Sequence, residues 1–154
     1  MKRAPNFILL DQGGVIRSLS DYVGKWIVLY FYPRDDTPGC TTEACSFRDE
    51  RDAIAEFGKA VVIGVSKDSV KSHKKFADKH GLNFTILSDE SLDVIKAYGA
   101  WGERSMYGRK FMGVIRSTVI IDPKGNIARE YPKVNPRKHA AEIIKDLKEL
   151  QGLN

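Results

Sequence analysis

The sequence predicts one α/β domain in which a central sheet carries helices on both faces. Segments with the composition of buried strands alternate along the chain with segments of helical period, and this alternation is typical of a sheet covered by helices. The chain has 154 residues, which suits a single domain over residues 1–154 with one sizeable core. We find no linker, internal repeat or low-complexity segment that would divide it.

Short apolar runs predict the strands. The longest, residues 26–32, is β-branched and aromatic and ends at Pro33, so it fits a central strand buried on both faces. The others are residues 60–65, 84–87, 117–121 and 127–131. The last two flank a turn at residues 122–126, whose Pro, Gly and Asn favour turn geometry, so they form a hairpin. Residues 7–18, with Gly13 and Gly14 at their middle, predict a second small hairpin.

Four segments between and after these strands predict helices. They are residues 42–57, 69–80, 91–98 and the segment from 136 onward. Ser69 is the expected N-cap of the second helix, and Gly81 follows its end. For the last helix we expect Asn135 as N-cap and Pro136 at the first helical position. Its apolar stripe consists of Ala140, Ile143, Ile144, Leu147 and Leu150.

Composition and charge exclude several classes of protein. Two cysteines are too few for a disulfide-dense secreted scaffold, and no apolar run approaches the ~20 residues of a membrane-spanning helix. With no export signal at the N-terminus, we expect a cytoplasmic protein without a membrane partner.

The net charge is +5, and residues 104–138 hold nine cations against two acids. We interpret this stretch as a solvated face, with docking of an acidic partner as the alternative; without a binding motif, nucleic acid is not expected.

Cys40 is the leading candidate for chemistry. It follows a buried strand, a polar turn and Pro38-Gly39, and it lies at the start of a helix. Unpaired backbone N–H groups and the positive end of the helix dipole converge there, and both favour thiolate over thiol. The alternative is an inert buried cysteine, which is common among free thiols.

Cys45 lies five residues after Cys40. If both are helical, their Cα atoms are about 8.7 Å apart, whereas a disulfide needs roughly 4.4–6.8 Å. A bond between them therefore requires the first helical turns to unwind. The alternative is that Cys45 is a core residue, since it falls on the apolar face with Ala44 and Phe47. The two roles are compatible, because Cys45 could be buried in the reduced helix and exposed when the helix unwinds. A zinc site is disfavoured, because His73, His80 and His139 are scattered and supply no ligand set at the usual spacing. A protease-like pair of cysteine and histidine stays open, but no feature selects a histidine.

The motif Pro33-x-x-x-Thr37-x-x-Cys40 resembles the active-site motif of the peroxiredoxins, which are thiol peroxidases with a thioredoxin-like fold. The string from Phe31 to Cys45, with a second cysteine five residues after the first, is similar to the bacterioferritin-comigratory, or Q, subfamily. Four further blocks resemble the same family: Ala4-Pro5-x-Phe7, Leu87-Ser88-Asp89, Gly99-Ala100-Trp101-Gly102-Glu103 and Gly113-Val114-Ile115-Arg116-Ser117-Thr118.

The resemblance implies a thioredoxin-like fold with a mixed central sheet and a division of roles in the site. Cys40 would be the peroxidatic cysteine, and Cys45 would resolve its sulfenic acid as an intramolecular disulfide. Thr37 would accept a hydrogen bond from the peroxide, although from residue type alone a turn-stabilising threonine is the simpler interpretation. Pro33 would shield the sulfur from water, besides ending a strand. Arg116 would stabilise the thiolate and the developing oxyanion, and only the resemblance selects it.

The resemblance also implies the partners. The substrates would be hydrogen peroxide or organic hydroperoxides, the reductant a thioredoxin-like dithiol protein, and no metal, haem or flavin cofactor is implied. We expect a monomer, with a weak dimer as the alternative. Two other functions remain open at this point: a redox sensor whose unwinding helix exposes a binding surface, and a basic thioredoxin-like binding module in which the cysteines only pack.

Overall fold

The computed structural model describes residues 2–152, which form two sheets, four α-helices and a short 3₁₀ helix, η1. The strands are β1 (Lys2–Arg3), β2 (Ile8–Asp11), β3 (Ile16–Ser18), β4 (Ile27–Phe31), β5 (Val61–Ser66), β6 (Thr85–Ser88), β7 (Trp101–Met106), β8 (Arg109–Val114), β9 (Ser117–Ile121) and β10 (Asn126–Tyr131). The helices are η1 (Leu19–Tyr22), α1 (Pro38–Ala55), α2 (Val70–His80), α3 (Asp93–Ala97) and α4 (His139–Leu150). Among these residues no helix is long and apolar enough to cross a membrane.

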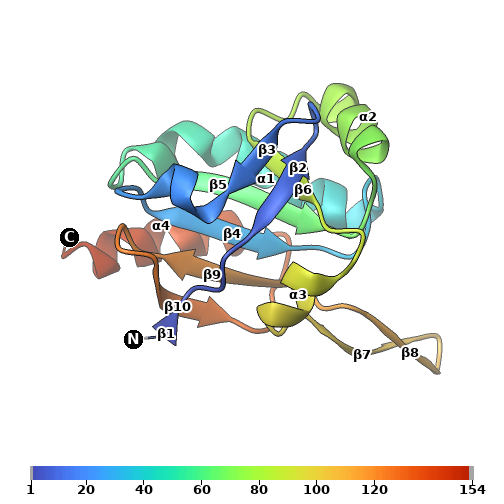
Figure 1. Cartoon of the computed structure of the whole chain (residues 1–154). Helices are drawn as coiled ribbons and strands as arrows, with labels where there is room; N and C mark the ends of the chain where they lie inside the picture. Colours follow the sequence, from blue (N-terminus) through green and yellow to red (C-terminus); the bar gives the residue numbers. More distant parts are fainter. Residues whose placement is uncertain (1, 153–154) are drawn as a thin grey trace.

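The main sheet has eight strands in the order β1-β10-β9-β4-β5-β6-β2-β3 (Figure 1). The three central strands β4, β5 and β6 are parallel, whereas β9 pairs antiparallel with β4, so the sheet is mixed. Every residue of β4 is buried, which confirms the predicted central strand. The expected hairpins β2–β3 and β9–β10 are both present.

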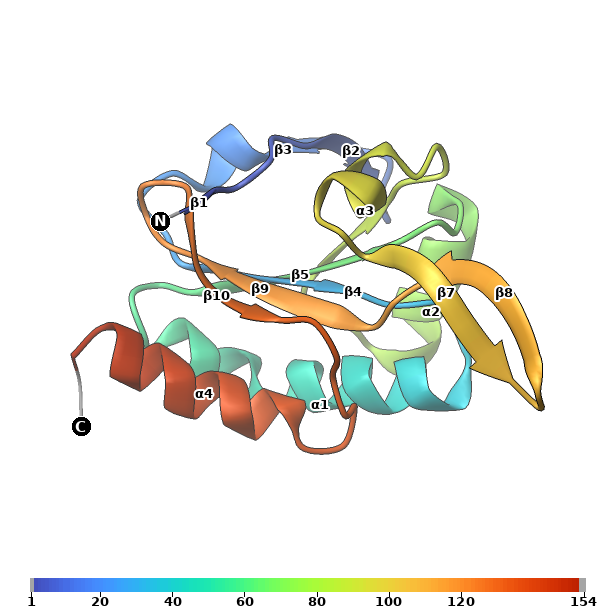
Figure 2. The ribbon, with the colours of Figure 1, turned by 90° about the horizontal axis from the view of Figure 1, so that it is seen from below.

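Helices cover both faces of this sheet, as predicted (Figure 2). On one face α1 and α4 lie side by side, and buried residues of α2 join them in one apolar core that contains Cys40. On the other face the short α3 packs with the N-terminal segment over a second core. Because parallel strands end at the same edge of a sheet, the loops after β4, β5 and β6 gather beside the N-terminus of α1.

Two predicted helix starts are wrong. Helix α1 begins at Pro38, four residues before the expected start, because Thr37 is extended and Pro38 suits the first helical position. Helix α4 begins at His139 and not at Pro136. The Asn135 side chain does accept a hydrogen bond from the backbone N–H of Arg137, but it stabilises a turn before the helix.

The hairpin of β7 and β8 was not expected from the sequence. It forms a separate two-stranded sheet that projects from the body of the molecule (Figures 1 and 2). Its base is buried at Ala100 and Val114, while Tyr107 at its tip is 99% exposed. Much of the basic stretch lies on this hairpin and on the loop that follows β10. The hairpin thus brings the chain back to Arg116, at the entrance of β9.

Candidate active site

Cys40 is buried at the third position of α1, where the strand-to-helix corner places it. The first helical hydrogen bond runs from the backbone N–H of Thr41 to the carbonyl of Thr37, at 2.8 Å. The N–H groups of Gly39 and Cys40 lie ahead of that bond, at the positive end of the helix dipole. The sulfur therefore sits in a local field that stabilises negative charge.

Arg116 lies 76 residues after Cys40 in the sequence and contacts it directly. Its Nη2 is 3.3 Å from the Cys40 Sγ, and its Nη1 donates to Oε1 of Glu43 at 2.7 Å. Gly39 leaves room for this approach, since a Cβ there would lie only 3.1 Å from the Arg116 Nη2. The guanidinium is thus fixed between a carboxyl group and the sulfur.

Glu43 is the buried acidic residue of this site. It follows Cys40 by one helical turn and is 1% exposed. Burial raises the pKa of Glu43 to about 7, and Arg116 only partly offsets this effect. The pKa of Arg116 is raised, because the neighbouring Cys40 and Glu43 outweigh the opposing effect of burial. The site therefore combines a permanent cation with a carboxyl group that titrates near neutral pH.

Thr37 and Pro33 lie in the loop that leads into α1. The Thr37 hydroxyl donates to the carbonyl of Arg34 at 2.9 Å, which leaves its oxygen lone pairs as acceptors. Pro33 directly follows the buried Tyr32 and is half-buried. The structure records no hydrogen bond from the Thr37 side chain to Cys40 among residues 2–152. It thus brings Arg116 to the sulfur and leaves Thr37 and Pro33 in the adjoining loop.

Cys45 lies in the same unbroken helix as Cys40, and both thiols are free. It is half-buried, so its expected place on the apolar face is only partly correct. The fully buried positions of α1 are Cys40, Glu43, Ala44, Phe47 and Ile54, and Cys45 lies at the border of this face. The structure thus matches the helical arrangement in which the two sulfurs are too far apart to bond.

Arg116 also lines an open cleft of about 470 Å³ between the β7–β8 hairpin and the loop after β10. Arg104 and Lys133 add two more cations to the wall, and Ile115 and Pro132 add apolar surface. The cleft gives a route from solvent to the guanidinium that contacts Cys40. Part of the basic stretch predicted from the sequence therefore borders this route.

Two features of the site region were not predicted. One is Glu43, which lies in the string that resembles the Q subfamily but was left out of the expected catalytic residues, because an acidic residue is also favourable in a first helical turn. The other is a buried cluster beside the loop, made of Asp35, Asp68 and His73, whose ligand atoms lie within 4.8 Å of one another. Such a group has the composition of a metal site, but hydrogen bonds within the cluster already use these atoms.

The chain is similar to known proteins over nearly its whole length. The AhpC/TSA family profile matches residues 1–130. Peroxiredoxin Bcp of Bacillus subtilis is 46% identical over 97% of this chain and 94% of its own. A structure of the Xanthomonas campestris bacterioferritin comigratory protein, studied for alkyl peroxide reduction, is 36% identical and has a TM-score of 0.88, covering 94% of this chain and 92% of that one. Peroxiredoxin Q of Xylella fastidiosa has the same identity and TM-score, covering 97% and 96%.

Proposed function

The chain belongs to the AhpC/TSA family, and on that premise we propose that it is a thiol peroxidase in which Cys40 reacts with the peroxide and Cys45 resolves the product. The observation that carries the proposal is the contact of 3.3 Å between Arg116 Nη2 and the Cys40 sulfur at the start of α1. A cysteine held this way is prepared for attack as a thiolate.

In the first step the Cys40 thiolate attacks one oxygen of the peroxide. A sulfur–oxygen bond forms, the O–O bond breaks, and the leaving oxygen departs as water or an alcohol after taking a proton. Arg116 and the N–H groups of Gly39 and Cys40 stabilise negative charge on the sulfur and on the oxygens. Thr37 accepts a hydrogen bond from the peroxide, and Pro33 limits access of water. The substrates are hydrogen peroxide and organic hydroperoxides.

In the second step the Cys45 thiol attacks the Cys40 sulfenic acid. A disulfide forms and water leaves, so two thiols are oxidised while one peroxide is reduced. Because α1 holds the cysteines apart, its first turns must unwind before this step. Oxidation is thus coupled to a local change of conformation.

A thioredoxin-like dithiol protein then reduces the disulfide by thiol–disulfide exchange, and we place the cycle in the reducing cytoplasm. The cations at the cleft and on the β7–β8 hairpin would attract an acidic reductase. Added salt is then expected to slow this step, and a rate that does not change with salt would contradict steering.

We propose a monomer built as one domain over residues 1–154, which light scattering would test. A doubled mass would indicate the weak dimer.

Cysteine variants test the two roles. We expect Cys40→Ser to react with hydrogen peroxide no faster than free cysteine does. We expect Cys45→Ser to complete one oxidation and to hold a sulfenic acid that dimedone labels. Rapid oxidation of Cys40→Ser at Cys45 would contradict the assignment, as would a slow Cys45→Ser variant. Full turnover by Cys45→Ser with thioredoxin would remove Cys45 as the resolving thiol.

A further inference from the structure

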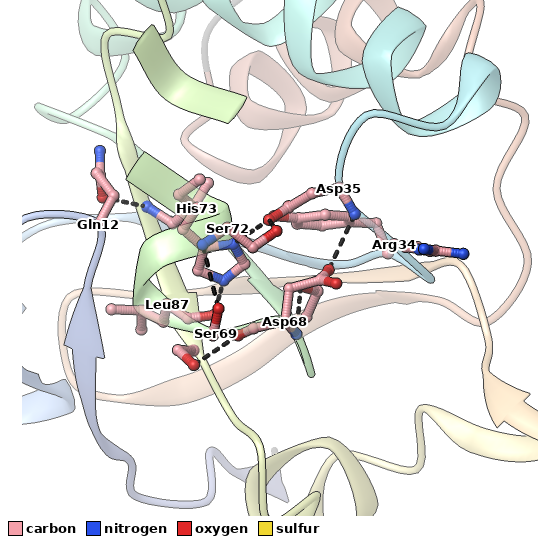
Figure 3. A network of polar contacts seen from close by, with 12 residues as sticks. Gln12, Arg34, Asp35, Asp68, Ser69, Ser72, His73 and Leu87 are labelled. Atoms are coloured by element: carbon pink, nitrogen blue, oxygen red, sulfur yellow. Dashed lines mark hydrogen bonds and ion pairs between the residues drawn. The ribbon is translucent and has the colours of Figure 1, made fainter. Parts of the chain in front are cut away.

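A buried polar network joins the loop at residues 33–37 to α2 and β6 (Figure 3). His73 of α2 has no exposed surface, and its Nδ1 lies 2.7 Å from Oδ2 of Asp35. The same oxygen accepts from the Ser72 hydroxyl at 2.8 Å, and Oδ1 accepts from the Tyr32 hydroxyl at 2.6 Å. On the far side of the ring, Nε2 lies 2.9 Å from the carbonyl of Leu87 in β6.

Both ring nitrogens of His73 have a hydrogen-bond partner. A backbone carbonyl is only an acceptor, so Nε2 donates to the carbonyl of Leu87. Nδ1 shares a hydrogen bond with Oδ2 of Asp35, whose two oxygens also accept from Tyr32 and Ser72. The His73 ring and the Asp35 carboxyl group therefore form a buried hydrogen-bonded pair in which every polar atom has a partner.

The backbone of the loop is fixed by the same cluster. The N–H of Asp35 donates to Oδ2 of Asp68 at 2.9 Å, and the Ser66 hydroxyl donates to the same oxygen at 2.6 Å. The next residue, Asp36, has a positive φ of 58° and pairs with the Lys79 Nζ at 2.7 Å. Two consecutive loop residues are thus attached to α2. The buried attachment through Asp35 is the stronger one, because water weakens exposed pairs.

We propose that His73 is a positioning residue for peroxide reduction, and this inference rests on the proposed function of Cys40. Its ring holds Asp35 through a hydrogen bond, and with it the loop that carries Pro33 and Thr37 into α1. While the loop is held, Cys40 stays at the helix start beside Arg116. The hydrogen-bonded pair therefore favours the helical form that reacts with peroxide, and it opposes the unwinding that brings Cys45 to Cys40.

Two substitutions of His73 each keep one of the two hydrogen bonds that the ring makes. In His73→Asn the amide replaces Nδ1 and keeps a donor toward Asp35. In His73→Gln it replaces Nε2 and keeps only the bond to Leu87. Loss of a buried hydrogen bond that leaves its partner unsatisfied is enough to change a two-state equilibrium by about tenfold. Because one equilibrium governs both steps, we expect His73→Gln to slow Cys40 oxidation and to speed disulfide formation, with the ratio of the two rates changing by about tenfold. His73→Asn should lie between His73→Gln and the wild type.

The test is stopped-flow measurement of both steps, with Ile95→Ala as the control. Ile95 lies in the core on the opposite face of the sheet, so its truncation lowers the melting temperature without touching the loop. Opposite changes in the two steps for His73→Gln, absent in the control, support the proposal. If His73→Gln leaves the rates of both steps unchanged, or lowers both rates as a general loss of stability would, the proposal is overturned. If His73→Gln does not fold, Ser72→Ala removes one donor to Asp35 and should shift both steps in the same directions. A wild type that forms no disulfide overturns the proposed function itself.

Discussion

Replacing Glu43 with glutamine tests the electrostatics of the site through the pH dependence of folding stability, which does not depend on catalysis. The pKa of Glu43 rises from 4.5 to about 7 on folding, and this rise corresponds to about 3 kcal/mol. Because the folded protein binds this proton more tightly than the unfolded chain, the carboxyl group stabilises the fold at low pH. That contribution is fully present below pH 4.5 and is lost as the pH rises through about 7.

Glutamine keeps an acceptor for Arg116 but cannot ionise, so the variant lacks this pH dependence. We expect the stability of Glu43→Gln relative to its parent to increase by about 2 kcal/mol between about pH 5.5 and about pH 8.5. The assay is urea unfolding followed by tryptophan fluorescence, with both proteins in a Cys40→Ser background that removes titration of the thiol. Glu50→Gln, on the exposed side of the same helix, is the matched control and should show no such trend. A difference that is constant with pH would refute the reasoning. A decrease with pH would mean that the ion pair outweighs burial.

Three further substitutions test the site and the fold. Arg116→Lys loses the paired contact to sulfur and Glu43, so its rate of oxidation by hydrogen peroxide should fall by about 10²-fold or more in stopped flow; Arg129→Lys, in the same basic stretch, should react as the wild type does. Gly64→Ala would place a Cβ 2.9 Å from the ring of Tyr30, and we expect a loss of about 1–3 kcal/mol in urea unfolding; an unchanged midpoint would contradict this. The Ser69 side chain caps α2 by accepting a hydrogen bond from the backbone N–H of Ser72. Ser69→Ala should therefore lower the free energy of unfolding by about 1 kcal/mol in the same assay, and a stabilised variant would show that the cap does not contribute.

The core of the fold was predictable because its strands are dense in apolar residues. The run at residues 26–32 has no alternation of polar side chains, and the structure buries β4 on both faces. The first residues of the helices were harder to predict, because the same residue types begin turns and helices. Asn135 and Pro136 have the residue types of a helix start, but they form a turn. The β7–β8 hairpin could not be recognised because its strands mix charged and apolar residues without alternation and are largely exposed.

Sequence spacing predicted the position of Cys40 but not its surroundings. Proline, glycine and cysteine at a strand-to-helix corner are local signals, whereas the contact of Arg116 with Cys40 joins residues 76 positions apart. Only the resemblance to the peroxiredoxins selected that arginine. His73 looked like one of three scattered histidines, since nothing local connects α2 to Asp35. Contacts of this kind are set by the packing of the sheet and helices and become visible only in three dimensions.

The mass of the oxidised protein tests the central claim most directly. Fully reduced protein is mixed with one equivalent of hydrogen peroxide, quenched within seconds with a thiol alkylator and weighed intact. We predict a species about 2 mass units lighter than the reduced protein and free of alkyl groups, because Cys40 and Cys45 have lost two hydrogens in forming a disulfide. Addition of one oxygen with Cys45 alkylated would keep Cys40 and exclude Cys45 as its partner. Two alkylated, unoxidised cysteines would contradict the account.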